Sequence, residues 1–354
     1  MVGFLLATVG LVVALIVALA VRQASGENAG VSTAVTGLPE EINPSAAVAV
    51  VPEEGAVGLG RIVYQCIECD PVLVLDGGEQ LVLAEDAEFG AGLAFSLSPD
   101  GRWLAQGTLS GVFLRDLGDG QAQIFEGLGG MIPWAWSSDS RQLLVAEPEA
   151  DRLLSTYWLV DLINQSMVEV EAIADREVVS VFPDGRLLAI DRLPDTPGMV
   201  EMIEGEVVDP ISGEVASVEI DGREWLDQGE SLSEGTGQFE GVQLLSNPAG
   251  EGFIVAVFGE ARGPVALLYV SDEGDVTSRV PLELPQEQGS WHVEGQFDGQ
   301  VVISNMRSLS PDGRGFGRIL YAVSVDGELR HLTTVSRADL LRLPGTAAFG
   351  GSSL

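Results

Sequence analysis

The stretch from Phe95 to Leu117, FSLSPDGRWLAQGTLSGVFLRDL, constrains the fold more than any other part of this chain. Apolar residues alternate with small or polar ones up to Ser98-Pro99-Asp100-Gly101, the pattern of a half-buried strand that enters a tight turn. Two further apolar runs follow, Trp103–Ala105 and Val112–Leu114. The stretch therefore predicts an antiparallel meander. Because one meander cannot bury both of its faces, we expect copies of it elsewhere in the chain.

The same pattern recurs four more times. The later turns are Ser137-Ser138-Asp139-Ser140, Pro183-Asp184-Gly185, Asn247-Pro248-Ala249-Gly250 and Phe297-Asp298-Gly299. The last residues of all five turns stand at positions 101, 140, 185, 250 and 299, so every interval but one gives a repeat of roughly 40 to 50 residues. Repeats of this kind, each with several short strands, are typical of propeller blades. The longest interval holds a Gly- and Glu-rich insertion around residues 221–240, which we interpret as an elaborated loop.

Residues 95–105 and 180–189 resemble the repeat of TolB-like and WD40-like β-propellers, the PD40 repeat. In that family an F-S-P-D-G-[KR]-x-L-A consensus marks the turn between the first two strands of a blade. Residues 95–105 carry one extra residue before Ser98, residues 180–189 lack one consensus position, and the other copies are degenerate. The resemblance covers about residues 60 to 335, and it concerns the fold rather than an activity.

The resemblance implies an all-β propeller of about six four-stranded blades, a fold often found outside the cytoplasm as a protein-binding platform. Five turns are visible, and residues 60–90 supply the outer part of a further blade. The family commonly closes its ring with a terminal strand, for which residues 45–51 and the tail after residue 343 are both candidates. Helical periodicity is nearly absent after residue 22, and only Arg337–Arg342 predicts a helical turn.

The N-terminal run Val2–Val21 has twenty consecutive residues without a charge, about the length that crosses a bilayer. It is either a transmembrane anchor or a secretory signal, since Ala18-Leu19-Ala20 offers a small-residue cleavage box. The run is longer than a usual signal core, which favours the anchor. We therefore predict an anchor or uncleaved signal at 1–22, a flexible Ala/Gly/Pro/Glu-rich linker at 23–58, the propeller at 59–340 and a tail at 341–354.

The chain is strongly acidic, with 53 Asp and Glu against 18 basic residues and a formal net charge of −35. All 18 basic residues are arginine. This balance excludes nucleic acid as a partner, because phosphate binding needs clustered cations. A GC-rich genome or adaptation to salt would produce the same composition, so the acidity by itself assigns no function.

Residues suited to chemistry are few. His292 and His331 have no neighbouring pattern that would recruit them as bases, and we expect ordinary surface or edge histidines. Cys66 and Cys69 form the only C-x-x-C, which we interpret as a disulfide across a hairpin loop rather than a zinc or redox site. Acidic turns at Asp116–Gly120 and Asp272–Asp275 could hold calcium, although tight turns select the same residues. No other cofactor is expected.

These observations predict a single-pass membrane protein whose large domain lies outside the cytoplasm. That orientation follows from the cleavage box and the resemblance, since Arg22 alone hardly discriminates. We expect a non-catalytic protein-binding or scaffolding module, with an envelope protein or peptide as partner and a monomeric ectodomain. The alternative is a propeller-type lyase or hydrolase that acts on glycan or peptide through carboxylates in the central channel. A transmembrane sensor is a third interpretation.

Overall fold

Strands form the regular structure of this chain. The computed structural model describes residues 37–43, 46–47, 49–65, 70–83, 95–148, 154–170, 173, 176–191, 202–221, 239–247, 252–259, 263–285, 289–308, 316–336 and 340–345. Among them are 26 strands and no α-helix. The chain divides into two units, Met1–Gly37 and Leu38–Leu354, and all of these strands belong to the second. The expected span Val2–Val21 lies outside the described residues, and no helix within them is long and apolar enough to cross a membrane.

Four antiparallel sheets, the second to fifth blades, each take four strands in sequence order from the inside outward. The second blade has β6 (Phe95–Leu97), β7 (Trp103–Gly107), β8 (Gly111–Asp116) and β9 (Ala122–Glu126). The third has β10 (Ile132–Trp136), β11 (Gln142–Pro148), β12 (Leu154–Asp161) and β13 (Ser166–Val170). The fourth has β14 (Arg176–Val181), β15 (Leu187–Asp191), β16 (Met202–Val208) and β17 (Val215–Asp221). The fifth has β18 (Phe239–Ser246), β19 (Phe253–Gly259), β20 (Gly263–Val270) and β21 (Val276–Pro281).

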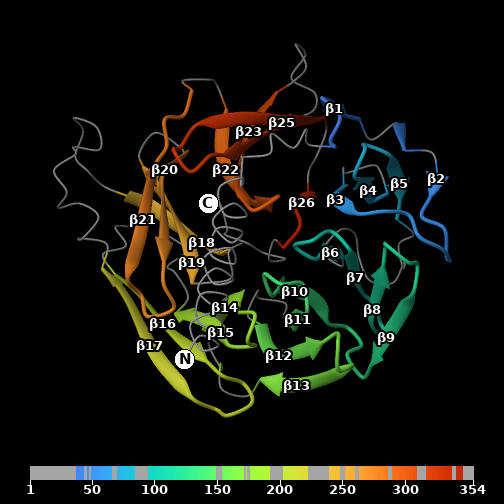
Figure 1. Ribbon diagram of the computed structural model, residues 1–354, viewed down its shortest axis with the longest axis horizontal. Helices are drawn as coiled ribbons and strands as arrows, with labels where there is room; N and C mark the ends of the chain where they lie inside the picture. Colours follow the sequence, from blue (N-terminus) through green and yellow to red (C-terminus); the bar gives the residue numbers. More distant parts are fainter. Residues whose placement is uncertain are drawn as a thin grey trace, which may run out of the picture. The chain divides into compact units, whose positions relative to one another are not determined.

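The first and sixth blades each have a fifth strand. The sixth contains β22 (Ser290–Phe297), β23 (Gln300–Ser308), β24 (Phe316–Val323) and β25 (Leu329–Ser336). The first contains β3 (Gly60–Gln65), β4 (Val72–Leu75) and β5 (Gln80–Val82), and its innermost strand is β26 (Leu340–Arg342) from the other end of the chain. Neighbouring blades contact each other all the way round, and the sixth meets the first through β22 and β26, so the second unit is a closed six-bladed propeller (Figure 1).

Two short strands before the first blade cover the outer edge of the ring. β1 (Glu41–Ile42) pairs in parallel with β25 of the sixth blade, and β2 (Ala49–Val50) pairs in parallel with β5 of the first. The side chain of Ile42 is fully buried. We call the described part of residues 38–51 the N-terminal strap. The junction between the sixth and first blades, the closing seam, is therefore held by β26 on the inside and by the strap on the outside.

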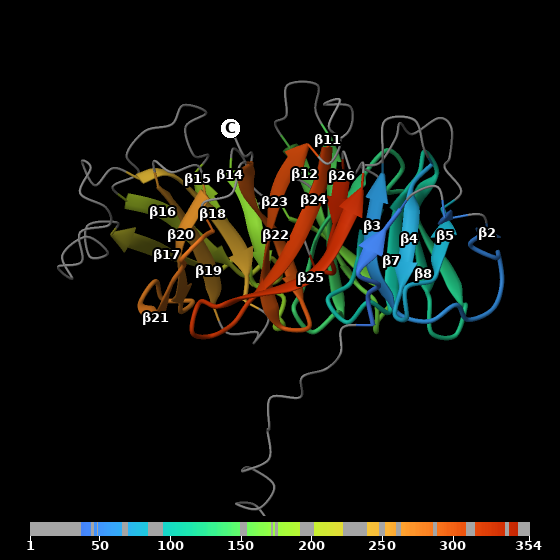
Figure 2. The same ribbon diagram turned by 90° about the horizontal axis from the view of Figure 1, so that it is seen from above.

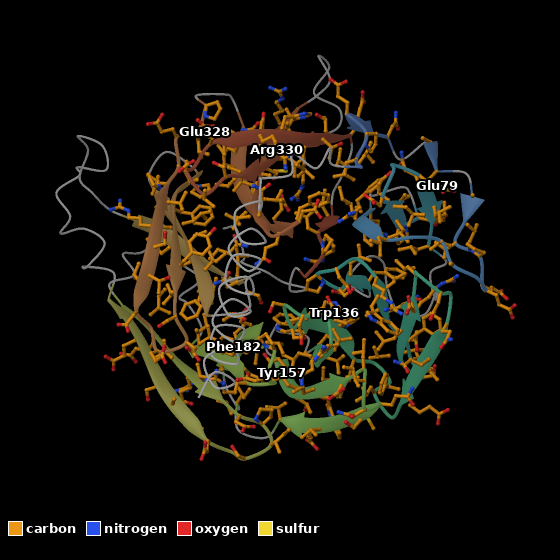
Figure 3. All side chains as sticks on the ribbon, viewed as in Figure 1. Glu79, Trp136, Tyr157, Phe182, Glu328 and Arg330 are labelled. Atoms are coloured by element: carbon orange, nitrogen blue, oxygen red, sulfur yellow. The ribbon has the colours of Figure 1, made fainter. Side chains whose placement is uncertain are left out.

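The core lies between the blades, because each sheet is apolar on both faces. Trp136 on β10 is fully buried, and its Nε1 donates to Ser96 Oγ of the second blade at 3.0 Å. Trp134 Nε1 donates to the Val178 carbonyl of the fourth blade at 2.7 Å. Trp136 and Phe182 both lie on the inner side of the ring (Figure 3). These tryptophans thus pack blades together.

The all-β fold and its six four-stranded blades confirm that part of the sequence prediction. Ring closure differs from both candidates, since residues 49–50 pair on the outer edge and the inner strand is β26, which ends before residue 343 and includes the first two residues of the range expected as tail, 341–354. The predicted helical turn at Arg337–Arg342 is wrong over Leu340–Arg342, which form that strand. Pairing with β3, which is distant in sequence, supplies hydrogen-bond partners there that local periodicity cannot reveal. The range expected as linker, 23–58, contains β1 and β2.

Candidate functional site

The turn motif predicted at Ser98–Gly101 connects the first and second strands of the second blade. Ser98 Oγ donates to Asp100 Oδ1 at 2.5 Å and accepts from Trp103 N at 2.8 Å. Asp100 Oδ1 also accepts from Arg102 N at 3.0 Å. Gly101 has φ +70°, and a Cβ there would lie 2.2 Å from the Gly60 carbonyl oxygen of the first blade. The motif residues therefore shape the turn and let the next blade approach.

The same network recurs in the third blade. Ser137 Oγ donates to Asp139 Oδ1 at 2.7 Å and accepts from Gln142 N at 2.9 Å. Ser140, which stands where the second blade has Gly101, has φ +62°. A serine is thus held in the left-handed conformation that glycine adopts most readily.

The fourth blade repeats the turn with Pro183-Asp184-Gly185. Asp184 Oδ1 accepts from Arg186 N at 3.1 Å, and Gly185 N donates to the Phe182 carbonyl at 3.0 Å. Arg186 also bridges Asp184 and Asp272 of the fifth blade, at 2.7 Å each. The predicted motif residues are therefore placed at equivalent turns on one rim of the ring, which Figure 2 shows edge-on.

Polar contacts at or next to these turns link every blade to the next. They form a belt around the ring whose residues, in order from the closing seam, are Arg61 and Asp298, Gly60 and Gly101, Asp100 and Ser140, Ser137 and Val181, Ser180 and Ser246, and Gln296 and Ser246. Hydrogen bonds make five of these links, and an isolated parallel β-bridge joins Ser137 to Val181. The belt gives the Ser, Asp and Gly residues of the motif an architectural role.

The acidic turns proposed for calcium are already engaged. Asp116 Oδ1 accepts from Gly118 N at 2.8 Å, and its Oδ2 accepts from Arg102 Nε at 2.7 Å. Burial would raise the pKa of Asp116, but these hydrogen bonds outweigh it and hold the pKa below its ordinary value. Asp272 is paired with Arg186. No group of three or more His, Cys, Asp or Glu side chains within the described ranges is arranged to hold a metal ion.

A second cluster of charged side chains lies at the closing seam, on β22 and β24 of the sixth blade and on β26 of the first. Glu294 lies at a bulge of β22, between the register pairs of Val293 and Gly295. Its Oε1 accepts from Ser304 Oγ of β23 and from Arg318 Nη1 of β24. Glu294 is buried, and so is Arg342 on β26 across the seam. Burial lowers the pKa of Arg342 to about 10, which leaves its guanidinium charged at neutral pH.

His292 belongs to this seam cluster. The strand register sets His292 opposite Ser304, and Ser304 opposite Leu320. Leu320 packs with Tyr64 and Leu341 of the first blade, so this face of the sixth blade is the one that meets the first. Burial lowers the pKa of His292, an effect that Glu294 opposes and Arg318 reinforces. Its Nε2 is buried, and none of the residues that the structure describes forms a hydrogen bond with it.

Not every residue singled out from the sequence can be placed. Cys66 and Cys69 lie outside the described residues, so the expected disulfide stays a prediction. His331 is exposed on β25, with Nε2 3.3 Å from Thr334 Oγ1. The seam cluster was not predicted, because Glu294, Arg318 and Arg342 lie on different strands and only ring closure brings them together. The one available signal was a histidine two residues before a glutamate in β22.

Comparison with known proteins leaves the family of this chain open. No family model matches it, and no curated protein matches its sequence. Solved structures with a similar fold include one assigned as TolB from Agrobacterium tumefaciens, at 13% identity and TM-score 0.44, covering 83% of this chain and 93% of that one. The β-propeller domain of the Trilobed protease from Pyrococcus furiosus has 14% identity and TM-score 0.39, covering 65% and 78%. A protein of unknown function from Bacteroides caccae has 14% identity and TM-score 0.41, and the match covers 80% of this chain and 97% of that one. At these values the fold assignment rests on the strand pairing itself.

Proposed function

We propose that this chain is a membrane-tethered, extracytoplasmic β-propeller that acts as a non-catalytic protein-binding or scaffolding module. Its partner is an envelope protein or peptide, and its large domain is monomeric. The uncharged run Val2–Val21 supplies the tether. A rigid ring that presents turns at its rims is suited to recognition, because the scaffold fixes the positions of the contacting side chains.

The observation that carries this proposal is a set of exposed aliphatic side chains at turn tips. Ile163, Ile211 and Val325 are 64%, 79% and 82% exposed. Each lies between the third and fourth strands of its blade, and in antiparallel sheets these turns share a rim with the first turns. Asp161 and Asp209 begin two of these turns. The rim therefore offers apolar contacts beside negative charge, which favours a partner with aliphatic and basic residues.

Affinity capture with matched variants tests the proposal. The full chain, in detergent, is used to capture proteins from envelope extract at low and high salt, alongside an Ile163→Asp/Ile211→Asp variant. Ile124→Asp is the control, because Ile124 is also exposed but lies within the outer strand β9. We expect one partner that the wild type and the control retain, that the double variant loses, and that high salt weakens. Equal retention by all three proteins would refute the rim as the binding surface.

One observation favours the alternative of a propeller-type lyase or hydrolase. Glu294 is a buried carboxylate on an innermost strand, beside His292 and Arg318. A carboxylate and an imidazole in one site are groups that acid–base chemistry uses. Turnover of a glycan or peptide by the wild type, and its loss in Glu294→Gln with the fold intact, would support this function over simple binding.

A further inference from the structure

The closing seam is the joint at which the ring depends on a short inner strand from the other end of the chain. β26 has three residues, and its register pairs are Leu340 with Gln65, Leu341 with Tyr64 and Arg342 with Val63. The next strand around the ring is β22, the innermost strand of the sixth blade. Opening here would part the inner edges of the first and sixth blades without breaking any other blade, while the strap still joins their outer edges.

This joint also contains charge and a histidine in a buried setting. Within the described part of the chain, Glu294 and Arg318 act electrostatically on His292, and Arg342 from β26 faces the same pair. Glu294 favours a positive charge on the imidazole, whereas Arg318 and burial disfavour it. The His292 Nε2 atom is buried and has no hydrogen-bond partner among the described residues, so a proton added there would find no acceptor among them.

We propose that the closing seam is a proton-sensitive latch, in which uptake of a proton by His292 loosens the pairing of β26 with β3 and opens the ring. The neutral imidazole fits a half-buried site in which its Nε2 is covered. The imidazolium adds a positive charge beside the Arg318 guanidinium, which already contacts the Glu294 carboxylate. Opening lets water reach the imidazole, and this hydration stabilises its charged form.

The direction of the pH effect follows from linkage. Burial lowers the pKa of His292 in the closed ring below the ordinary value of 6.5. In the opened seam the imidazole is hydrated, and its pKa returns to that ordinary value. The closed state is therefore fully favoured above about pH 6.5. Below that pH the open state takes up the proton first, and the opening equilibrium rises by up to about tenfold per pH unit until the closed form is protonated too.

Hydrogen exchange measured by mass spectrometry on the full chain in detergent tests this latch. Rates are corrected for intrinsic pH dependence between pH 7.5 and 5.0, and segments covering β3 and β26 are compared with β10–β12 of the third blade. His331→Gln is the matched control for His292→Gln, because His331 is the other histidine and is exposed on the same blade. We expect acid-dependent opening of the seam in the wild type and in His331→Gln, and none in His292→Gln.

Acid-dependent opening that persists in His292→Gln, or that is equal in all blades, would overturn the proposal. If that variant fails to fold, the His292 imidazole signal of the wild type is followed by NMR over the same pH range. A titration midpoint below that of a histidine in an unfolded peptide supports the latch, and a midpoint at or above it overturns it.

Discussion

Arg61 of the first blade donates from Nη1 to Asp298 Oδ1 of the sixth blade at 2.7 Å, across a separation of 237 residues. The same guanidinium lies 5.3 Å from the centre of the Phe297 ring and pairs with Asp76 at 3.1 Å. One side chain therefore joins the two blades that meet at the closing seam, on the rim where the belt of turns runs.

Replacing Arg61 should loosen that joint. For Arg61→Ala we expect the free energy of unfolding to fall by about 1 kcal/mol, because an ion pair and a cation–π contact are lost together. Urea unfolding of the full chain in detergent measures this. Arg141→Ala is the control, since Arg141 is mostly exposed and pairs with Asp139 in its own turn. An equal loss in the two variants would contradict a special role for Arg61.

Gly101 should tolerate no side chain. Gly101→Ala should lower the free energy of unfolding by more than about 1 kcal/mol, because it combines a left-handed conformation with a clash against the Gly60 carbonyl. Gly213 has φ +73°, but a Cβ at that position would meet no atom within 4 Å, so Gly213→Ala isolates the conformational cost. Thermal or urea unfolding of both variants should show the larger loss at Gly101. Equal losses would mean that the first blade can move aside.

The N-terminal strap should stabilise the ring through Ile42. We expect Ile42→Ala to lower the free energy of unfolding by about 2–4 kcal/mol, as for other large-to-small changes at fully buried sites. Val50→Ala is a suitable control, because Val50 lies on the same strap but is 59% exposed. Urea unfolding again provides the measurement, and hydrogen exchange along β25 shows whether the loss is local. If both substitutions have no effect, the strap does not stabilise the ring.

Asp116 should make stability depend on acid pH. Its pKa in the folded chain lies below the ordinary value of 3.8, so its contribution is complete above about pH 4 and is lost as pH falls through the folded pKa. Unfolding free energies measured between pH 3 and 6 should therefore fall less steeply at the acid end in Asp116→Asn than in the wild type. The same slope in both proteins would exclude this role.

The sequence contains most of the information needed to recognise the propeller, because each first turn carries its own local chemistry. Five such turns are visible for six blades, and the structure explains the difference. The first blade takes its inner strand from Leu340–Arg342, so the connection that would carry the motif does not exist there. The sequence pattern of residues 60–90 therefore indicates only the outer part of a blade.

The closing seam could not be predicted in the same way. Strand β26 is too short to show a period, and its preference is set by the edge of β3 that it covers. Glu294, Arg318 and Arg342 acquire their electrostatic environment only when the two ends of the chain meet. The strap presents a similar case, since its two strands are only two residues long. β1 pairs with β25 and β2 pairs with β5, and neither partner is adjacent in sequence.

The closure through β26 also determines the order in which the protein can mature. A chain made from its N-terminus produces β3 to β5 before any other blade, yet this sheet stays incomplete until residues 340–342 have emerged. We expect the nascent protein to carry an unpaired inner edge on β3 throughout its synthesis. It therefore depends on protection from aggregation until β26 pairs with that edge. The first blade to be translated is thus the last to be finished.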